Sequence, residues 1–229
     1  MQHYKNLTII GTSHIAESSI REIKGEFSKS NPDIVAVELD RGRLEALLHN
    51  ERPSYSPRLI FQIGVTGYLF AVLGGLLQKK LGNLVGVSPG SEMLQAALLA
   101  RDNQKKLALV DQDVRITLRR LSQLFTFREK LRMVLDVFRS PFDKRLQIDL
   151  RGVPSKAVIR DLLKIIRTRY PGMYASLIGE RNHFMAAKLA GIMHSYPDAK
   201  VLAVVGAGHE EELAVLVSQK HASIKIEKN

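Results

Sequence analysis

Four short runs of the sequence are apolar at every position, and they alternate with longer segments of helix length. A strand that is covered on both faces reads as a continuous apolar run rather than as an alternating pattern. The runs are LTII (7–10), IVAV (34–37), LALV (107–110) and VLAVV (201–205). Strands interleaved with helices predict an α/β fold with a mainly parallel central sheet flanked by helices.

The segments between these runs predict the helices, and one of them is too long for a single crossover. Residues 112–195 contain no convincing strand, so we expect a long helical insertion before the last core strand, within one α/β domain that covers 1–229. The alternating run SIKI (223–226) predicts an edge strand. The expected helices are 16–29, 42–50, 59–81, 91–103, 113–139, 156–169 and 174–195.

Polar residues follow each apolar run. The first run leads into GTSH (11–14), the second into ELD (38–40), the third into DQD (111–113) and the fourth into GAGH (206–209). Ligands of parallel α/β sheets bind outside the carboxyl ends of the strands. We therefore expect His14 and His209 on one rim of the sheet, where Gly11 and Gly206 allow a sharp turn and leave room for a ligand.

His14, Glu38 and His209 are the candidate metal ligands and catalytic groups. Neutral imidazole binds metals and titrates near neutral pH. Glu38 follows a wholly apolar strand, and it either caps a neighbouring helix or joins the two histidines. Two histidines and a carboxylate suit a divalent ion such as zinc, manganese or cobalt. Such an ion lowers the pKa of bound water and polarises a carbonyl group.

Arg181 falls in the apolar row of a predicted helix, together with Leu177, Met185 and Leu189. A buried guanidinium without a partner is costly, so a carboxylate or an anionic ligand must meet it. Two roles stay open and are compatible with one another. Arg181 forms an ion pair with Glu38 or with Asp111, or it stabilises an oxyanion during hydrolysis.

Other charged residues have simpler interpretations. Glu92 lies in the first turn of a predicted helix, where an acidic residue favours the helix dipole. Asp111, Asp113 and Arg115 surround the end of the third strand and are candidates for a structural charge cluster. The acidic residues 210–212 are expected to serve the N-terminus of the following helix.

The chain contains no cysteine, so disulfides, thiolate zinc sites and cysteine nucleophiles are excluded. Its formal net charge is +11. The excess charge concentrates in 115–151, where ten Lys and Arg face four Asp and Glu. We interpret this stretch as a solvated basic face, with an anionic membrane or an acidic partner as alternatives. The spacing of its phenylalanines suits helix packing better than base stacking, so we do not expect nucleic acid as a partner.

The segment LIFQIGVTGYLFAVLGGLL (59–77) is almost wholly apolar and close to the shortest length that spans a bilayer. Gly67, Ala71 and Gly75 form a ladder of small residues that lets another helix approach closely. We expect a buried or subunit-packing helix, which predicts a homodimer, with membrane insertion as the alternative. The predicted location is therefore cytoplasmic or membrane-associated.

Six blocks of the sequence resemble the TraB family in order and spacing. This family is grouped with Tiki-type proteases, erythromycin esterases and ChaN-like haem-binding proteins. The resemblance covers essentially the whole chain. The blocks are GTSHIAESS, IVAVELDRGRLEAL, GVSPGSEMLQAALLA, LVDQDVRITLRRL, LIGERNHFMAAKL and VVGAGH.

The resemblance implies an α/β fold with a site built from paired GxxH motifs, a glutamate and an arginine. The matching positions here are Gly11, His14, Glu38, Arg181, Gly206 and His209. The same blocks carry the supporting positions Arg43, Glu92, Asp111, Arg115 and Glu180, and they place Gln112 where the family often has arginine.

TraB-like proteins are linked to the shutdown of peptide pheromones, and Tiki proteins resemble metal-dependent peptidases. We therefore expect a metal-dependent hydrolase, a peptidase acting on signalling peptides, in which His14, Glu38, Arg181 and His209 are catalytic. A metal-free hydrolase with histidine as general base is one alternative. A non-catalytic protein that binds a peptide or another ligand, at a membrane or in solution, is the other.

Overall fold

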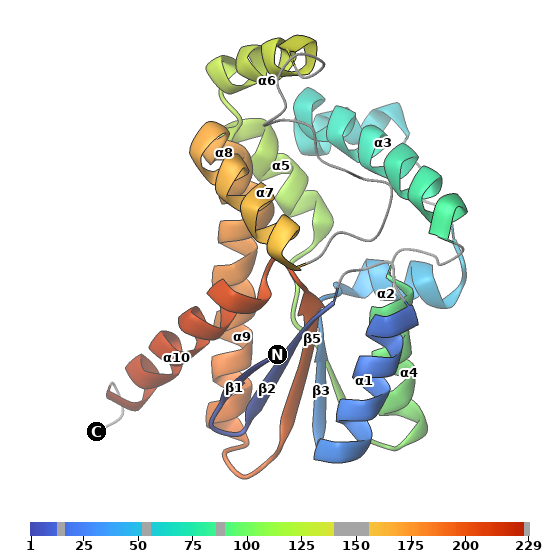
Figure 1. The fold of residues 1–229 in the computed structure, drawn as a ribbon, viewed down its shortest axis with the longest axis vertical. Coiled ribbons are helices and arrows are strands. Elements are labelled where there is room, and N and C mark those ends of the chain that lie inside the picture. The colour runs from blue at the N-terminus through green and yellow to red at the C-terminus, as the bar shows by residue number, and fades with distance from the viewer. Residues whose placement is uncertain (13–16, 52–55, 86–89, 140–155, 227–229) are drawn as a thin grey trace.

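The computed structural model describes residues 1–12, 17–51, 56–85, 90–139 and 156–226, and a five-stranded sheet organises them (Figure 1). The strand order is β1-β2-β5-β3-β4. The bounds are β1 Gln2–Tyr4, β2 Leu7–Thr12, β3 Ile34–Val37, β4 Lys106–Leu109 and β5 Val201–Gly206. Only β1 is antiparallel to its neighbour, so the predicted α/β fold with a mainly parallel sheet is confirmed.

The strand register aligns the carboxyl ends of the strands. Thr12 lies beside Gly206 in the β2–β5 pair, and Val37 lies beside Leu109 in the β3–β4 pair. Polar residues that follow these strands therefore emerge along one edge of the sheet.

Helices cover both faces of the sheet, as the apolar strands predict. On one face, α9 (Glu180–Ser195) and α10 (Glu210–Ile226) pack Met185, Leu189 and Leu213 against the strands. On the other face, α1 (Glu17–Ser30) and α4 (Ser91–Asp102) contribute Ile23 and Met93. Figure 1 shows these two layers on opposite sides of the strands.

A helical lobe lies beyond the carboxyl edge of the sheet (Figure 1). It contains α3 (Ile60–Val85), α5 (Val114–Leu124), α6 (Phe127–Arg139), α7 (Lys156–Arg169) and α8 (Pro171–Tyr174). A separate apolar cluster of Leu121, Phe125, Tyr170 and Met173 holds it together, with Phe70 of α3 packed against it. The described residues between Val114 and Ser195 include no strand, in agreement with the expected helical insertion.

Two predicted helices are interrupted. The segment 113–139 divides into α5 and α6 because Phe125 leaves helical geometry and the side chain of Glu129 accepts the N–H of Thr126, which starts a new helix. The segment 174–195 opens with a π-helical turn, Ala175–Gly179, before α9. A single turn of this kind is frequent at functional sites.

The predicted edge strand at 223–226 is wrong. These residues complete α10, whose inner face buries Leu213, Val217 and His221. A four-residue alternation is too short to outweigh the packing of a long helix. The edge of the sheet next to β2 is instead occupied by β1.

The segment 59–77 forms part of α3, which packs one face on α5 and leaves the other face exposed. It is therefore not a fully buried helix, and packing of its exposed face on a second subunit stays a prediction. The described part of α3 leaves Phe61, Val65, Leu69, Leu73 and Leu76 exposed. Gly67 faces α5 rather than a second subunit, because a Cβ there would lie 2.4 Å from the carbonyl oxygen of Leu118. The homodimer itself stays a prediction, but it cannot use the Gly67 surface.

The helix also shows why its apolar composition is weak support for a membrane span. Pro57–Leu76 is long and apolar enough to cross a bilayer, and only 11% of the apolar window is buried. However, Gly64 has φ 76° and ψ 165°, which breaks the helical path within this stretch. A continuous helix of about 20 residues is what a bilayer crossing requires.

The close approach of α3 and α5 gives a test with an internal control. We expect Gly67→Ala to lower the free energy of unfolding by about 1–3 kcal/mol, since the added methyl group collides with the α5 backbone. In contrast, a Cβ at Gly74 meets nothing within 4 Å. Gly74→Ala should therefore stabilise the protein by up to about 1 kcal/mol through helix propensity. Denaturant titration measures both, and equal effects would contradict the packing described here.

Candidate functional site

Four elements bring polar side chains to the carboxyl edge of the sheet. Glu38 directly follows β3, Asp111 lies two residues beyond β4, and His209 lies in the turn between β5 and α10. Arg181 enters from the first turn of α9. We call Glu38, Asp111, Arg181 and His209 the rim cluster. His14, the other predicted histidine, lies outside the described residues.

Arg181 is the centre of the rim cluster. Its Nε donates to Asp111 Oδ1 at 3.0 Å, and its Nη2 donates to Asp111 Oδ2 at 2.7 Å and to Glu38 Oε1. Its Nη1 donates to the carbonyl oxygen of Leu177 at 3.2 Å. The expected ion pair is therefore confirmed, and it includes both carboxylates. A guanidinium has five N–H groups, and four are used here.

The electrostatic balance favours a permanent charge on Arg181. Burial alone would lower the pKa of this guanidinium, but the charges of Glu38 and Asp111 and their hydrogen bonds raise the pKa above the ordinary arginine value. Arg43 adds a second guanidinium, 3.5 Å from Asp111 Oδ2. Two carboxylates and two guanidiniums thus neutralise one another at the edge of the sheet.

Glu38 links Arg181 to the β5 turn. Its Oε2 accepts the backbone N–H of Gly206 at 2.6 Å, which explains why the glycine motif has to lie close to this carboxylate. Its Oε1 lies 3.4 Å from His209 Nε2. Glu38 and His209 are both buried, each with 4% of its surface exposed. These contacts connect Glu38 to Arg181, Gly206 and His209, and none of them caps a helix.

A hydrogen-bond relay fixes the orientation of His209, and the sequence did not reveal it. Asn182 Oδ1 lies 2.6 Å from His209 Nδ1, while Asn182 Nδ2 donates to Glu212 Oε2 at 3.0 Å. Tyr174 donates its hydroxyl hydrogen to the same oxygen of Glu212 at 2.5 Å. Since Glu212 can only accept when ionised, Asn182 must present its oxygen to His209.

The relay assigns roles to the two ring nitrogens of His209. Nδ1 carries the proton that Asn182 accepts, so Nε2 is the nitrogen that exchanges a proton or binds a metal. Nε2 faces the carboxylate of Glu38. At 3.4 Å, Glu38 Oε1 is close enough to stabilise a positive charge on this nitrogen, either a proton that it takes up or a metal ion that it binds.

The other predicted residues divide into two groups. Gly11 is needed, because a Cβ there would lie 2.2 Å from the carboxylate of Glu210. By contrast, Arg115 is exposed and lies 4.0 Å from its neighbour Asp113, and Glu180 pairs with Arg120 of α5. Glu92 lies in the first turn of α4, as expected, and its burial goes beyond what the helix dipole predicts. Of the expected charge cluster, only the pair of Asp113 and Arg115 is formed, and Asp111 binds Arg181 and Arg43 instead.

The rim cluster meets part of the requirement for a metal site. Zinc bonds of 2.0–2.2 Å place two ligand atoms of a tetrahedral site roughly 3.3–3.6 Å apart, which matches the 3.4 Å between His209 Nε2 and Glu38 Oε1. Within the described ranges, no group of three His, Cys, Asp or Glu residues is placed to hold an ion. The two donors fit in spacing, and the third predicted ligand is His14.

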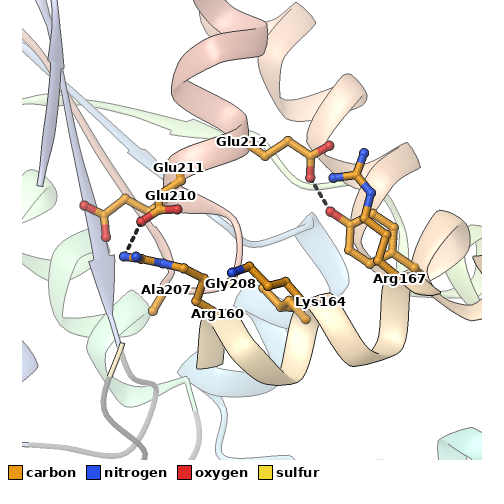
Figure 2. A pocket seen from close by; sticks show the side chains of 10 residues that line it. Arg160, Lys164, Arg167, Ala207, Gly208, Glu210, Glu211 and Glu212 are labelled. Atoms are coloured by element: carbon orange, nitrogen blue, oxygen red, sulfur yellow. Dashed lines mark hydrogen bonds and ion pairs between the residues drawn. The ribbon is translucent and has the colours of Figure 1, made fainter. Parts of the chain in front are cut away.

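A pocket of about 190 Å³ adjoins the relay (Figure 2). One wall is the basic face of α7, with Arg160, Lys164 and Arg167, and the opposite wall is the turn from Ala207 to Glu212. Arg160 pairs with Glu211 at 2.7 Å across it. Tyr174 and Glu212 line the pocket and belong to the relay, so a ligand here would lie beside the groups that orient His209.

The two buried carboxylates that Arg181 binds predict a large loss of stability when its charge is removed. We expect Arg181→Met to lower the free energy of unfolding by about 3–5 kcal/mol, because two buried carboxylates lose their counter-charge. The exposed pair of Arg160 and Glu211 is the control, and Arg160→Met should change the free energy of unfolding by less than about 1 kcal/mol. If Arg181→Met does not fold, adding Glu38→Gln and Asp111→Asn should restore folding. Failure of this triple variant would contradict the electrostatic cause.

The relay predicts a change of stability at alkaline pH. Burial, the hydrogen bond to Glu212 and the charge of that carboxylate raise the pKa of Tyr174 to about 12, above about 10 for an unfolded tyrosine. The unfolded state therefore loses its proton first, so the stabilisation is complete below pH ~10 and is lost as the pH rises towards ~12. Unfolding free energies of the wild type should fall more steeply across this window than those of Tyr174→Phe. Parallel curves would reject the assignment.

Comparison of the sequence with known proteins places the chain in a family. The model of the TraB/PrgY/gumN family matches residues 2–211. An uncharacterized protein of Methanocaldococcus jannaschii is 32% identical over 213 residues, which cover 90% of this chain and 52% of that protein. TraB domain-containing proteins of Bos taurus and Homo sapiens are each 23% identical over 227 residues, 88% of this chain and 59% and 60% of those proteins. The chain thus spans little more than half the length of these relatives, and it belongs to the TraB/PrgY/gumN family.

Proposed function

We propose that the chain is a hydrolase of peptides, with His209 as the general base and the rim cluster as its support. The observation that supports this most is the orientation of His209. Asn182 holds Nδ1, and Glu38 lies beside Nε2, so the imidazole is set to take a proton at Nε2 and to be stabilised as imidazolium by a buried carboxylate.

In this proposal Nε2 of His209 removes a proton from the attacking water. Glu38 balances the positive charge that develops on the ring, and Arg181 holds Glu38 in position through its short charge-assisted contact. Arg181 has one N–H left for the oxyanion of the substrate, so its main role is to position Glu38. Stabilisation of the oxyanion through that single N–H is the lesser of the two roles of Arg181.

A divalent metal ion defines a second version of the proposal, in which Nε2 of His209 would bind the ion and would not act as the general base. His209 and Glu38, together with His14, would hold it, and zinc, manganese or cobalt suits such ligands. A bound ion would supply an activated water. Glu38 Oε1 has two lone pairs, so it could bind the ion with one and accept the hydrogen bond of Arg181 with the other.

The pocket beside the relay supports a peptide as the substrate. It offers cationic groups on α7 and carboxylates on α10, and both kinds of charge suit a chain that has an amino and a carboxyl end. The pheromone-like peptides implied by the sequence resemblance are the substrate class that we propose.

A non-catalytic ligand-binding protein is the second candidate. One observation favours it, because four of the five N–H groups of Arg181 bind groups of the protein itself. An arginine so fully used resembles a structural element more than a group kept for a substrate. In that case a peptide would occupy the pocket without being cleaved.

Peptide-library cleavage by the purified protein tests the proposal. We expect His209→Gln to reduce the rate by about 10²–10⁴-fold, as for loss of a general base, and His183→Gln to leave it unchanged, since His183 is an exposed neighbour on α9. Asn182→Leu should shift the pH dependence of kcat/KM, because Nδ1 loses its acceptor. Circular dichroism checks that each variant is folded. Cleavage that survives in His209→Gln, or no cleavage with peptide still bound, would favour the second candidate.

Metal removal separates the two hydrolytic versions. If the ion takes part, a chelator should abolish cleavage, zinc, manganese or cobalt should restore it, and Glu38→Gln should lower the bound metal per chain. Cleavage that resists chelation in a metal-free sample would instead leave His209 acting without an ion.

A further inference from the structure

Helix α6 has its apolar side chains on the outside. Phe127 and Phe138 are 78% and 73% exposed, and Leu131, Val134 and Leu135 between them are also exposed. Their spacing of three or four residues places all five on one face of the helix. Among the described residues of the lobe, this face has no protein covering it.

The inner face of α6 carries the acidic residues instead. Glu129 accepts the N–H of Gly172 at 2.7 Å, and Asp136 binds Arg169 and the hydroxyl of Tyr170. Both carboxylates are buried. A rotation of α6 about its axis that buried the apolar face against the protein would break the hydrogen bonds of Glu129 and Asp136. These two buried carboxylates therefore keep the phenylalanines on the outer face.

The sides of the apolar face carry only positive charge. Arg128 and Arg132 are exposed and Lys130 is half-buried, and the two acids of the helix are both used on the inner face. An apolar face bordered by basic residues is the pattern of helices that lie in the interface of an anionic bilayer. A helix of 13 residues is about 20 Å long, too short to cross a bilayer and suited to lying in its plane.

A second copy of the chain fits this face less well. Two α6 helices packed face to face would bring arginines and lysines of the same sign together around a dry contact, without acidic partners to neutralise them. Anionic lipid headgroups supply the missing counter-charge and the acyl chains supply the apolar phase.

Helix α3 presents a second exposed apolar surface. Its exposed side chains are Phe61, Val65, Leu69, Leu73 and Leu76. The stretch Pro57–Leu76 contains no acidic residue. Both α3 and α6 belong to the helical lobe beyond the carboxyl edge of the sheet (Figure 1).

We propose that the helical lobe docks on a bilayer that contains anionic lipid, with α6 lying in the headgroup region and its phenylalanines among the acyl chains. This interaction does not depend on the hydrolytic proposal, because none of its residues belongs to the rim cluster or the relay. The bilayer would be recognised by its negative surface charge together with its apolar interior.

The absence of tryptophan from the chain makes a direct test possible. Phe127→Trp and Phe138→Trp each place a single tryptophan on the proposed contact, and Tyr196→Trp places one at the C-terminal end of α9 as the control. With vesicles of phosphatidylcholine and phosphatidylglycerol, we expect the emission of the first two to shift to shorter wavelength and to be quenched by brominated acyl chains. The control should do neither. Vesicles of phosphatidylcholine alone should give a much weaker response, and high salt should weaken the anionic response.

Charge substitution supplies an independent test by vesicle flotation. Leu131→Glu combined with Val134→Glu should reduce binding by about tenfold or more, whereas Val215→Glu on the exposed side of α10 should not. No response of α6 to anionic vesicles would overturn the proposal. So would a tryptophan shift that appears without lipid as the protein concentration rises, which would identify a second copy, or an equal shift at Tyr196→Trp, which would identify unfolding on the vesicle.

Discussion

The contact of Arg181 with the buried carboxylates Glu38 and Asp111 holds helix α9 on the carboxyl edge of the sheet. Glu38 and Asp111 emerge from β3 and β4, and Arg181 reaches them from α9, so one guanidinium joins two strands to the first turn of a helix that follows the insertion. A pair of carboxylates cannot be buried without this counter-charge. The position of α9 against the rim is therefore an electrostatic requirement as well as a packing result, and Gly206 and His209 are placed relative to the same Glu38.

His209 is oriented from the other side by neutral hydrogen bonds. Arg181 and Asn182 are consecutive in α9 and point to different partners, one to the carboxylates and one to the histidine. The π-helical turn that precedes them alters the helical register at this point. One short stretch of helix thus fixes both the charge beside Nε2 and the proton on Nδ1. That double constraint is what distinguishes His209 from a histidine that merely fills space.

Much of this architecture could be predicted from the sequence, because it depends on local patterns. Continuous apolar runs identified the four parallel strands, their polar ends identified Glu38 and Asp111, and an arginine in an apolar row required a carboxylate partner. The relay could not be predicted, since it depends on which way Asn182 faces after a π-helical turn. Residue type alone likewise did not separate Glu212 from the other acids that start α10. The spacing in α6 shows one apolar face, but only the contacts of Asp136 show that this face points outward.

The rim and the lobe follow the same electrostatic rule, and a direct set of contacts joins them. In each place a buried carboxylate receives an arginine from another helix, Asp111 from α9 and Asp136 from the end of α7. Between them, Arg120 of α5 holds Glu180 through three hydrogen bonds, and Glu180 is the residue before Arg181. Helix α6 follows α5 after a break at Phe125, and its orientation is set by its own contacts, Glu129 with Gly172 and Asp136 with Arg169. The outward apolar face of α6 and the orientation of His209 thus depend on separate sets of contacts, and in both sets a buried carboxylate is held by an arginine.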